Sequence, residues 1–295
     1  MMLAERDRFD QALRARGYEP VWAKVRQHLD EAECLAAVGE IDGWLAGDDR
    51  ITRAVLERAL PRLKVIAKWG SGVDSIDRAA AEALGVPVLN APGAFADAVA
   101  ECAIGMTLML TRHLGAVDRA VRAGAWPKPQ GRELRGRVMG LVGYGAIGRR
   151  VGALAEAFGM QVIFSDPAQP GAVPLERLAA ESDVVCLASA LTAENRGMVD
   201  AAFLDRMKPD AILVNVARGP LVDETALITA LDRGAIAGAA LDVFEVEPPA
   251  PGHALLGRDD VVLGSHNANN GRAAVEAVHQ RTLDNLDGAL LGSRG

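Results

Sequence analysis

The sequence predicts an α/β fold in which helices cover both faces of a parallel sheet. Two observations lead to this prediction. Short apolar runs rich in β-branched residues alternate with Ala- and Leu-rich stretches of helical period, and one of these runs leads through a glycine-rich turn into a helical stretch. We expect strands at Leu63–Ala67, Val86–Leu89, Val138–Val142, Gln161–Ser165, Asp183–Leu187, Ala211–Val216, Ala237–Asp242 and Asp260–Leu263, and helices that include Arg149–Phe158 and Glu224–Arg233.

The length and composition are those of a globular protein with about two domains. The chain has 295 residues, and a domain has about 150. Half of the residues are hydrophobic and 24% are charged, which suits an ordinary core. No apolar run reaches the roughly 18 residues of a membrane span, and the start lacks the apolar stretch of a secretory signal. The net charge of −7 disfavours nucleic acid as the main partner.

The three cysteines, Cys34, Cys102 and Cys186, are few, odd in number and widely spaced. This pattern argues against a disulfide scaffold and a zinc site of the CxxC type, and we expect no metal. Each cysteine lies in an apolar context and is expected to be a small buried residue. The sequence therefore indicates a reducing compartment, the cytoplasm.

A G-x-G-x-x-G motif at Gly143, Gly145 and Gly148 lies between an expected strand and an expected helix. Such glycines permit a tight turn, a close approach of the backbone to a pyrophosphate, and close packing of helix on strand. Asp166 ends the next strand, where a carboxylate accepts hydrogen bonds from ribose hydroxyls and repels a 2′-phosphate. No arginine follows it immediately. The motif predicts dinucleotide binding, with NAD favoured over NADP.

The motif stands about 140 residues into the chain, although it normally occupies the first strand of its domain. We therefore expect a domain to precede it. The segment Ala98–Val121 has the pattern of one long helix, and a polar stretch with prolines, Trp126–Arg132, separates it from the next strand. A long helix followed by a new series of strands and helices indicates a crossing between domains.

Three residues follow expected strands of this second domain and have side chains suited to hydride chemistry: Arg218, Glu247 and His266. Hydride transfer to a carbonyl needs a proton donor, a cation that holds the substrate, and a dry nicotinamide pocket. Ligands bind at the carboxyl ends of parallel strands. Each residue also has an ordinary interpretation, as a turn arginine, a solvated glutamate or a structural histidine, and position alone leaves both interpretations open.

A set of motifs in a fixed order makes the interpretation specific. They are Lys68-Trp-Gly-Ser-Gly-Val-Asp-Ser-Ile-Asp77, Asn90-Ala-Pro-Gly93 with Val99-Ala-Glu101, Gly143–Gly148, Leu191-Thr192, Met207-Lys-Pro209, Asn215-Val-Ala-Arg-Gly219, Gly238-Ala-Ala-Leu-Asp-Val-Phe244, Glu247-Pro248 and Ser265-His266. Over residues 44–270 the chain resembles the D-isomer-specific 2-hydroxyacid dehydrogenase family, which includes phosphoglycerate, glyoxylate/hydroxypyruvate and D-lactate dehydrogenases.

The resemblance implies roles for individual residues. Arg218 would hold the substrate carboxylate and the 2-oxo oxygen, and His266 would be the acid in reduction and the base in oxidation. Glu247 would hydrogen-bond the imidazole, fix its tautomer and raise its pKa. Backbone N–H groups of Ser71 and Gly72 would also bind the carboxylate. Besides Gly143, Gly145, Gly148 and Asp166, the implied cofactor contacts are Ala146, Ile147, Thr192, Ala217 and Asp242.

The resemblance also implies a domain arrangement. A Rossmann NAD-binding domain, residues 98–267, would be inserted into a discontinuous, flavodoxin-like substrate domain formed by residues 1–97 and 268–295. The helices that cross between them would be Phe95–Arg112 and about Gly271–Asn285, with the active site in the interdomain cleft. A homodimer through the NAD domains is implied as well, with the apolar helix Val99–Leu110 either in its interface or in the core.

The first residues depart from the family, which begins with an apolar strand that is central in a flavodoxin-like sheet. Here a helical pattern, Ala4–Arg16, begins almost at once, and Met1–Leu3 is too short for a strand. Either the start was assigned too far downstream or the domain lacks its first strand, and we favour a misassigned start. Without that strand, the segments Pro20–Ala23 and Ile41–Leu45 lose their shared neighbour.

The loop after the second of these segments is acidic. It carries Asp48 and Asp49 where many relatives have Arg-Ser, in the expected substrate entrance. Two carboxylates there make a doubly charged phosphorylated substrate less favourable, although Arg50 and Lys68 could partly compensate.

The leading hypothesis is an NAD-dependent oxidoreductase that interconverts a small D-2-hydroxy acid and its 2-oxo acid. A second hypothesis is a non-enzymatic NADH-sensing scaffold of the C-terminal-binding-protein kind, which keeps the same three residues but for which the sequence shows no recruitment tail. A third is a dehydrogenase of a phosphonate or phosphite, and a fourth is a remnant with damaged substrate binding. The sequence does not decide which 2-hydroxy acid is used.

Overall fold

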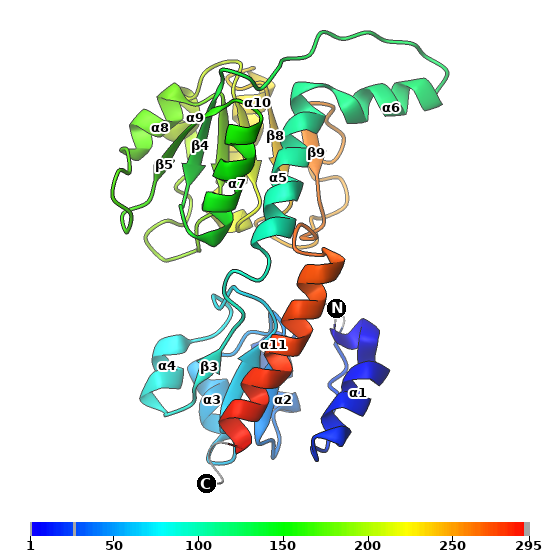
Figure 1. Ribbon diagram of the computed structural model, residues 1–295, viewed down its shortest axis with the longest axis vertical. Helices are drawn as coiled ribbons and strands as arrows, with labels where there is room; N and C mark the ends of the chain where they lie inside the picture. Colours follow the sequence, from blue (N-terminus) through cyan, green and yellow to red (C-terminus); the bar gives the residue numbers. More distant parts are fainter. Residues whose placement is uncertain (1, 26–27, 292–295) are drawn as a thin grey trace. The chain divides into compact units, whose positions relative to one another are not determined.

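The computed structural model describes residues 2–25 and 28–291 and divides the chain into two compact units (Figure 1). Unit 1 is formed by Met1–Ala94 and Arg272–Gly295, and unit 2 by Phe95–Gly271. Unit 1 is therefore discontinuous in sequence, because the chain leaves it, builds unit 2 and then returns.

Unit 2 contains a six-stranded sheet of order β5-β4-β6-β7-β8-β9 in which every pair is parallel. Its strands are β4 (Val138–Val142), β5 (Gln161–Ser165), β6 (Val184–Leu187), β7 (Ile212–Asn215), β8 (Gly238–Leu241) and β9 (Val261–Leu263). The strands expected in this unit are confirmed to within one residue at either end. From β4 the chain passes to β5 on one side and later crosses to β6 on the other. Ligands bind beyond the carboxyl ends of the strands at such a reversal.

Helices cover both faces of this sheet (Figure 1). On one face α5 (Ala96–Thr111) lies on β7, β8 and β9, and α7 (Ala146–Ala157) packs beside it on β4 and β5. On the other face lie α8 (Leu175–Glu181), α9 (Ala201–Arg206) and α10 (Glu224–Asp232). Strands buried on both faces explain the continuous apolar runs of the sequence. No helix within the described ranges has the length and apolar character that a membrane crossing needs.

The single long helix expected at Ala98–Val121 is wrong. The helix α5 ends at Thr111, and a separate helix, α6 (Leu114–Arg122), starts after His113, whose φ of 54° is left-handed. A residue in that conformation cannot continue a right-handed helix. The helix α6 has no buried residue and projects from the sheet of unit 2 (Figure 1).

Unit 1 contains a three-stranded parallel sheet of order β1-β2-β3. Its strands are β1 (Gly43–Ala46), β2 (Val65–Lys68) and β3 (Val88–Leu89), so the strands expected at Leu63–Ala67 and Val86–Leu89 begin two residues later than predicted. Alternate residues of β2 face opposite cores, as the period of two in a strand requires. The helices that surround the sheet are α1 (Arg6–Ala15), α2 (Glu31–Ala37), α3 (Arg53–Ala59), α4 (Arg78–Ala83) and α11 (Arg272–Leu291).

Within the described residues no strand precedes β1, which forms one edge of this sheet. A short 3-10 turn, Met2–Glu5, leads directly into α1, in agreement with the helical pattern at Ala4–Arg16. The expected extended segment Pro20–Ala23 does not form a strand, and Val21 within it is exposed. The described strands of unit 1 pair only with one another, so the backbone of this segment is not part of the sheet.

A buried histidine of α11 in unit 1 packs against the N-terminal helix α1. His279 is 1% exposed, and its ring lies 4.9 Å from the Phe9 ring and 5.8 Å from the Trp69 ring. The nearest carboxylate oxygen, on Glu5, is 3.8 Å from Nδ1. Burial lowers the pKa of His279, and the Glu5 charge only partly opposes this. The histidine is therefore neutral in the folded protein at neutral pH.

We predict that unit 1 loses stability on acidification because of this residue. A histidine whose folded pKa lies below its unfolded pKa stabilises the protein above the unfolded value, about 6.5, and this contribution is lost as the pH falls. The melting temperature should thus decrease between pH 7.5 and 5.5, and the decrease should be smaller for His279→Leu. The exposed His28 offers a matched control, His28→Gln, which should leave the decrease unchanged. Equal decreases in wild type and His279→Leu would refute the assignment.

Candidate active site

The glycine motif forms the turn between β4 and α7. Gly143 has a φ of +91°, and a Cβ there would lie 2.7 Å from backbone atoms of Ser189, while a Cβ on Gly148 would lie 2.2 Å from the Gly143 carbonyl oxygen. Both positions therefore require glycine. A Cβ on Gly145 would meet nothing within 4 Å, so this residue faces open space at the start of α7. That space, beside a helix N-terminus that no side chain caps, suits a pyrophosphate.

Asp166 follows β5 and lies beside this turn. Its Oδ2 accepts the Tyr144 N–H at 2.7 Å, and its Oδ1 accepts the Ala168 N–H at 2.9 Å. Each carboxylate oxygen has a second lone pair, which can accept a further hydrogen bond. The half-buried carboxylate is thus fixed beyond the ends of β4 and β5, where ribose hydroxyls are bound in sheets of this kind.

An arginine that sequence reasoning missed lies in the same region. Arg149, in the first turn of α7, stands over the Tyr144 ring at 5.1 Å and donates to the Gln169 side chain at 2.6 Å. Tyr144 in turn stacks on Phe164 with a centroid distance of 4.0 Å. Arg149 precedes Asp166 by 17 positions, so no signal adjacent to the aspartate could reveal it. Only the packing of α7 beside β5 brings a cation to this place.

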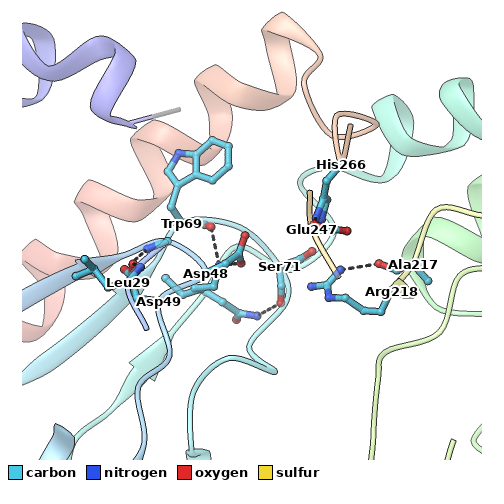
Figure 2. A network of polar contacts seen from close by, with 12 residues as sticks. Leu29, Asp48, Asp49, Trp69, Ser71, Ala217, Arg218, Glu247 and His266 are labelled. Carbon is cyan, nitrogen blue, oxygen red and sulfur yellow. Dashed lines mark hydrogen bonds and ion pairs between the residues drawn. The ribbon is translucent and has the colours of Figure 1, made fainter. Parts of the chain in front are cut away.

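Arg218 lies in the turn after β7, and the buried Asn215 spans that turn. Asn215 Nδ2 donates to the Arg218 carbonyl oxygen at 2.9 Å, and its Oδ1 accepts the Ala217 N–H at 3.0 Å. Arg218 Nη1 donates to the Ala217 carbonyl oxygen at 2.8 Å (Figure 2). A Cβ on Gly219 would lie 1.8 Å from the Phe244 carbonyl oxygen, so the turn packs directly on the segment after β8. Asn215 and Gly219 are positioning residues to which the sequence assigned no role.

The imidazole of His266 is paired with Glu247. Nδ1 lies 2.8 Å from Glu247 Oε2 (Figure 2), and the other carboxylate oxygen accepts the Phe244 N–H at 3.0 Å. Burial acts to raise the pKa of Glu247, but the hydrogen bond and charge of His266, the Phe244 N–H and the Arg218 charge outweigh it and lower the pKa. Glu247 is therefore an anion at neutral pH. An anion at Nδ1 favours a proton on that nitrogen.

The turn that carries His266 is held by Asp242, which follows β8 and is 3% exposed. Its Oδ1 accepts the Asn267 N–H at 3.0 Å, its Oδ2 accepts the Ala268 N–H at 2.9 Å, and its carbonyl oxygen accepts the His266 N–H at 2.6 Å. In this turn His266 has a φ of +55°, which is uncommon outside glycine. The resemblance implied a cofactor contact for Asp242. The structure adds a positioning role, because the chain itself uses both carboxylate oxygens.

A second buried carboxylate holds the loop that contains Glu247. Glu224, at the start of α10, is 9% exposed, and its Oε1 accepts the Glu245 N–H at 2.6 Å. Its Oε2 lies 3.1 Å from Nε2 of His253, at the far end of the same loop. The loop is thus tied to the body of unit 2 on both sides of Glu247.

The remaining expected cofactor residues lie around the same sheet edge. Ala146 is exposed and Ile147 half-buried in the first turn of α7. Thr192 is exposed, and its N–H donates to Asn195 Oδ1 at 2.7 Å in the loop that follows β6. Ala217 is 7% exposed in the Arg218 turn. All of them follow strands of unit 2 at their carboxyl ends.

Ser71 and Gly72 lie in unit 1, in the loop after β2. The Gly70 carbonyl oxygen accepts the Ala91 N–H at 2.9 Å, and the Ser71 carbonyl oxygen accepts the Asn90 side-chain amide at 2.7 Å. In a trans peptide the N–H points opposite to the preceding C=O. The N–H groups of Ser71 and Gly72 therefore point away from the segment 90–91, and such a pair of backbone donors suits an anion.

The described part of the chain contains no group of three His, Cys, Asp or Glu side chains placed to hold a metal ion. The three cysteines are free. Burial raises the pKa of Cys34 to about 12, with help from the Asp49 charge, and burial raises that of Cys186 to about 12. These two thiols are therefore protonated and structural, not nucleophilic.

The arrangement in unit 2 combines three chemical capabilities at one sheet edge. A glycine turn and Asp166 suit a dinucleotide, an imidazole paired with an anion suits proton transfer, and the Arg218 turn packed against the Glu247 loop supplies a cation. Together these are the requirements of hydride transfer to or from a carbonyl carbon.

Comparison with known proteins agrees with this chemistry. The family model for the D-isomer specific 2-hydroxyacid dehydrogenase, NAD binding domain, matches residues 104–268. The chain is similar to the hydroxypyruvate reductase of Thermotoga maritima, with 38% identity over 250 residues that represent 81% of this chain and 82% of that protein.

Two solved structures show the likeness over the whole fold. The D-lactate dehydrogenase of Aquifex aeolicus in complex with NAD and lactic acid has a TM-score of 0.88 and 27% identity, over 98% of this chain and 93% of that chain. The NADPH-dependent glyoxylate/hydroxypyruvate reductase of Sinorhizobium meliloti in complex with NADP and malonate has a TM-score of 0.77 and 34% identity, over 84% and 80%.

Proposed function

The chain belongs to the D-isomer-specific 2-hydroxyacid dehydrogenase family, and from this premise we propose that it interconverts a small D-2-hydroxy acid and its 2-oxo acid with NAD. Membership makes it an oxidoreductase with a nicotinamide cofactor. The observation that carries the proposal is the pair of His266 and Glu247, 2.8 Å apart, at the end of the sheet that bears the dinucleotide turn. The three relatives described above are named for small acids without a phosphate group.

The proposed proton carrier is His266. In reduction the protonated ring donates a proton from Nε2 to the oxygen that develops negative charge, and in oxidation the neutral ring removes the hydroxyl proton. Glu247, whose pKa is lowered, stays ionised and stabilises the protonated ring. The same carboxylate keeps the ring oriented through its bond to Nδ1.

Substrate binding is assigned to a cation and to backbone donors. Arg218 would hold the carboxylate and polarise the 2-oxo oxygen, a bidentate task that suits a planar guanidinium. The N–H groups of Ser71 and Gly72 would donate hydrogen bonds to a substrate carboxylate. NAD, when bound, accepts or supplies the hydride, and the turn Gly143–Gly148 would hold its pyrophosphate.

Two further proposals concern assembly and location. We propose a homodimer through unit 2, supported by α6, which has no buried residue and exposes Leu114 and Val121. Most of the expected interface helix Val99–Leu110 packs in the core of its own unit instead. Sedimentation of the purified protein should give the mass of two chains, and the mass of a single chain would exclude the homodimer.

The free cysteines support a reducing compartment, the cytoplasm, as the location of the protein.

We predict that His266→Ala lowers kcat for reduction of glyoxylate or hydroxypyruvate by about 10²- to 10⁴-fold, because the proton donor is lost. Binding of NADH, measured by its fluorescence, should not change. The exposed His28 provides the control, since His28→Ala should retain full activity. Unchanged turnover in His266→Ala would remove His266 from its proposed role. If the wild type binds NADH but reduces no 2-oxo acid, the proposed reaction itself is wrong.

We predict that the coenzyme preference depends on Asp166. The carboxylate repels a 2′-phosphate, and Arg149 provides a cation nearby. In Asp166→Asn, which keeps an acceptor for one of the two backbone N–H groups, the ratio of kcat/KM for NADPH to that for NADH should rise about tenfold or more. Arg149→Gln in the same background should reverse part of this gain. A ratio that does not respond to Asp166→Asn would contradict the assignment of NAD specificity to this residue.

A further inference from the structure

Two charged side chains that the proposed reaction does not use lie at the carboxyl edge of the sheet in unit 1. The strands β1 and β2 end together, with Ala46 paired to Lys68 in the parallel register. Lys68 is the last residue of a strand that is buried throughout, and it is only 3% exposed. Lysine is almost never fully buried without a partner. A buried ammonium at this strand end therefore needs an explanation.

The partner of Lys68 is Asp48, two residues beyond the end of β1. Lys68 Nζ donates to Asp48 Oδ1 at 2.9 Å and to the Trp69 carbonyl oxygen at 3.2 Å. The two side chains differ sharply in exposure, 3% for Lys68 and 63% for Asp48. The pair thus hides its positive charge and presents its negative charge to solvent.

The neighbouring Asp49 has a different function. It is 7% exposed, and its two oxygens accept the Leu29 N–H and the Gly47 N–H, each at 3.0 Å (Figure 2). This carboxylate holds the loop together and does not face solvent. Of the two acidic residues in the loop, only Asp48 can act on a molecule that approaches it.

The pair lies next to the loop assigned to the substrate carboxylate. Trp69, whose carbonyl oxygen binds the Lys68 ammonium, is followed directly by the loop that contains Ser71 and Gly72. A substrate held by those two N–H groups brings its remaining substituents into the field of Asp48. A second negative charge on the substrate meets an exposed carboxylate there, while the cation that would attract it is covered and already neutralised.

We propose that Asp48 is a specificity-determining residue that restricts the enzyme to monoanionic 2-oxo and 2-hydroxy acids and disfavours acids with a second anionic group, a phosphate or a distal carboxylate. This inference rests on the proposed function, because it concerns the substrate class of the same site. Lys68 serves as the internal counter-charge that fixes the Asp48 carboxylate in place.

The test compares two acids that differ by a phosphate group on C3, hydroxypyruvate and 3-phosphohydroxypyruvate. The measured quantity is the ratio of kcat/KM for the phosphorylated acid to that for the unphosphorylated acid. Asp48→Asn removes the exposed anion and keeps the Lys68 side chain, so the ratio should rise about tenfold or more. Lys68→Met removes the counter-charge and leaves Asp48, so the ratio should fall below that of the wild type.

A matched control is available at the other end of β1. Asp42 precedes that strand and pairs with Arg62 at 3.1 Å, so Asp42→Asn makes the same change in net charge away from the loop. It should leave the ratio unchanged. A buried Lys68 without its partner is destabilising, so melting curves are recorded for every variant. If Asp48→Asn does not fold, Asp48→Asn/Lys68→Met removes both charges and should still raise the ratio above that of the wild type.

A folded Asp48→Asn with a ratio within about twofold of the wild type would overturn the proposal and leave Asp48 as a structural partner of Lys68. A wild-type preference for the phosphorylated acid would overturn it as well, and would point to the exposed Arg50 instead. Calorimetric binding of D-glycerate and D-3-phosphoglycerate in the presence of NAD gives the same ratio without turnover. If no acid is turned over but this binding ratio shifts as predicted, the proposed reaction fails and the specificity assignment holds.

Discussion

The candidate site depends on one buried carboxylate. Asp242 binds the backbone N–H groups of residues 266, 267 and 268 through its carbonyl oxygen and its two side-chain oxygens. A buried carboxylate without such donors would be costly, and the N–H groups would lack acceptors, so each satisfies the other. The resulting turn holds His266 in a left-handed conformation with Nδ1 directed at Glu247. The geometry of the proposed proton donor is therefore set by a residue that need not touch the substrate.

The same principle applies to the other side of the site. Asn215 shapes the turn that carries Arg218, and Gly219 allows that turn to pack against the Phe244 carbonyl. The turn of Arg218 directly follows β7, which is buried throughout, and the turn of His266 is bound by Asp242, which directly follows the buried strand β8. Charged groups fixed in this way need little reorganisation when charge develops on a substrate, which is the main advantage of a preorganised site.

The sequence predicts the central strands of unit 2 well because they are buried on both faces, and β6 is an unbroken apolar run while β7 is apolar up to Asn215. The residue pattern alone does not predict the helix break at His113, since neither glycine nor proline marks that position, whereas the family resemblance places the end of this helix at Arg112. Arg218, Glu247 and His266 can be selected because each follows a strand, which is local information. The positioning roles of Asn215 and Asp242 cannot, because they consist of hydrogen bonds that only the folded turns create.

In the proposed reaction, the Glu247 anion maintains His266 as the proton donor. The most direct measurement is the pH dependence of kcat/KM for 2-oxo acid reduction in wild type and Glu247→Gln. Reduction requires the protonated ring, and the lowered pKa of Glu247 keeps its carboxylate charged throughout the neutral range. We predict that in Glu247→Gln the alkaline fall begins at a lower pH than in the wild type, with a loss of about ten- to a hundredfold at pH 7. An alkaline fall at the same pH in both proteins would show that the Glu247 anion does not maintain the protonated ring.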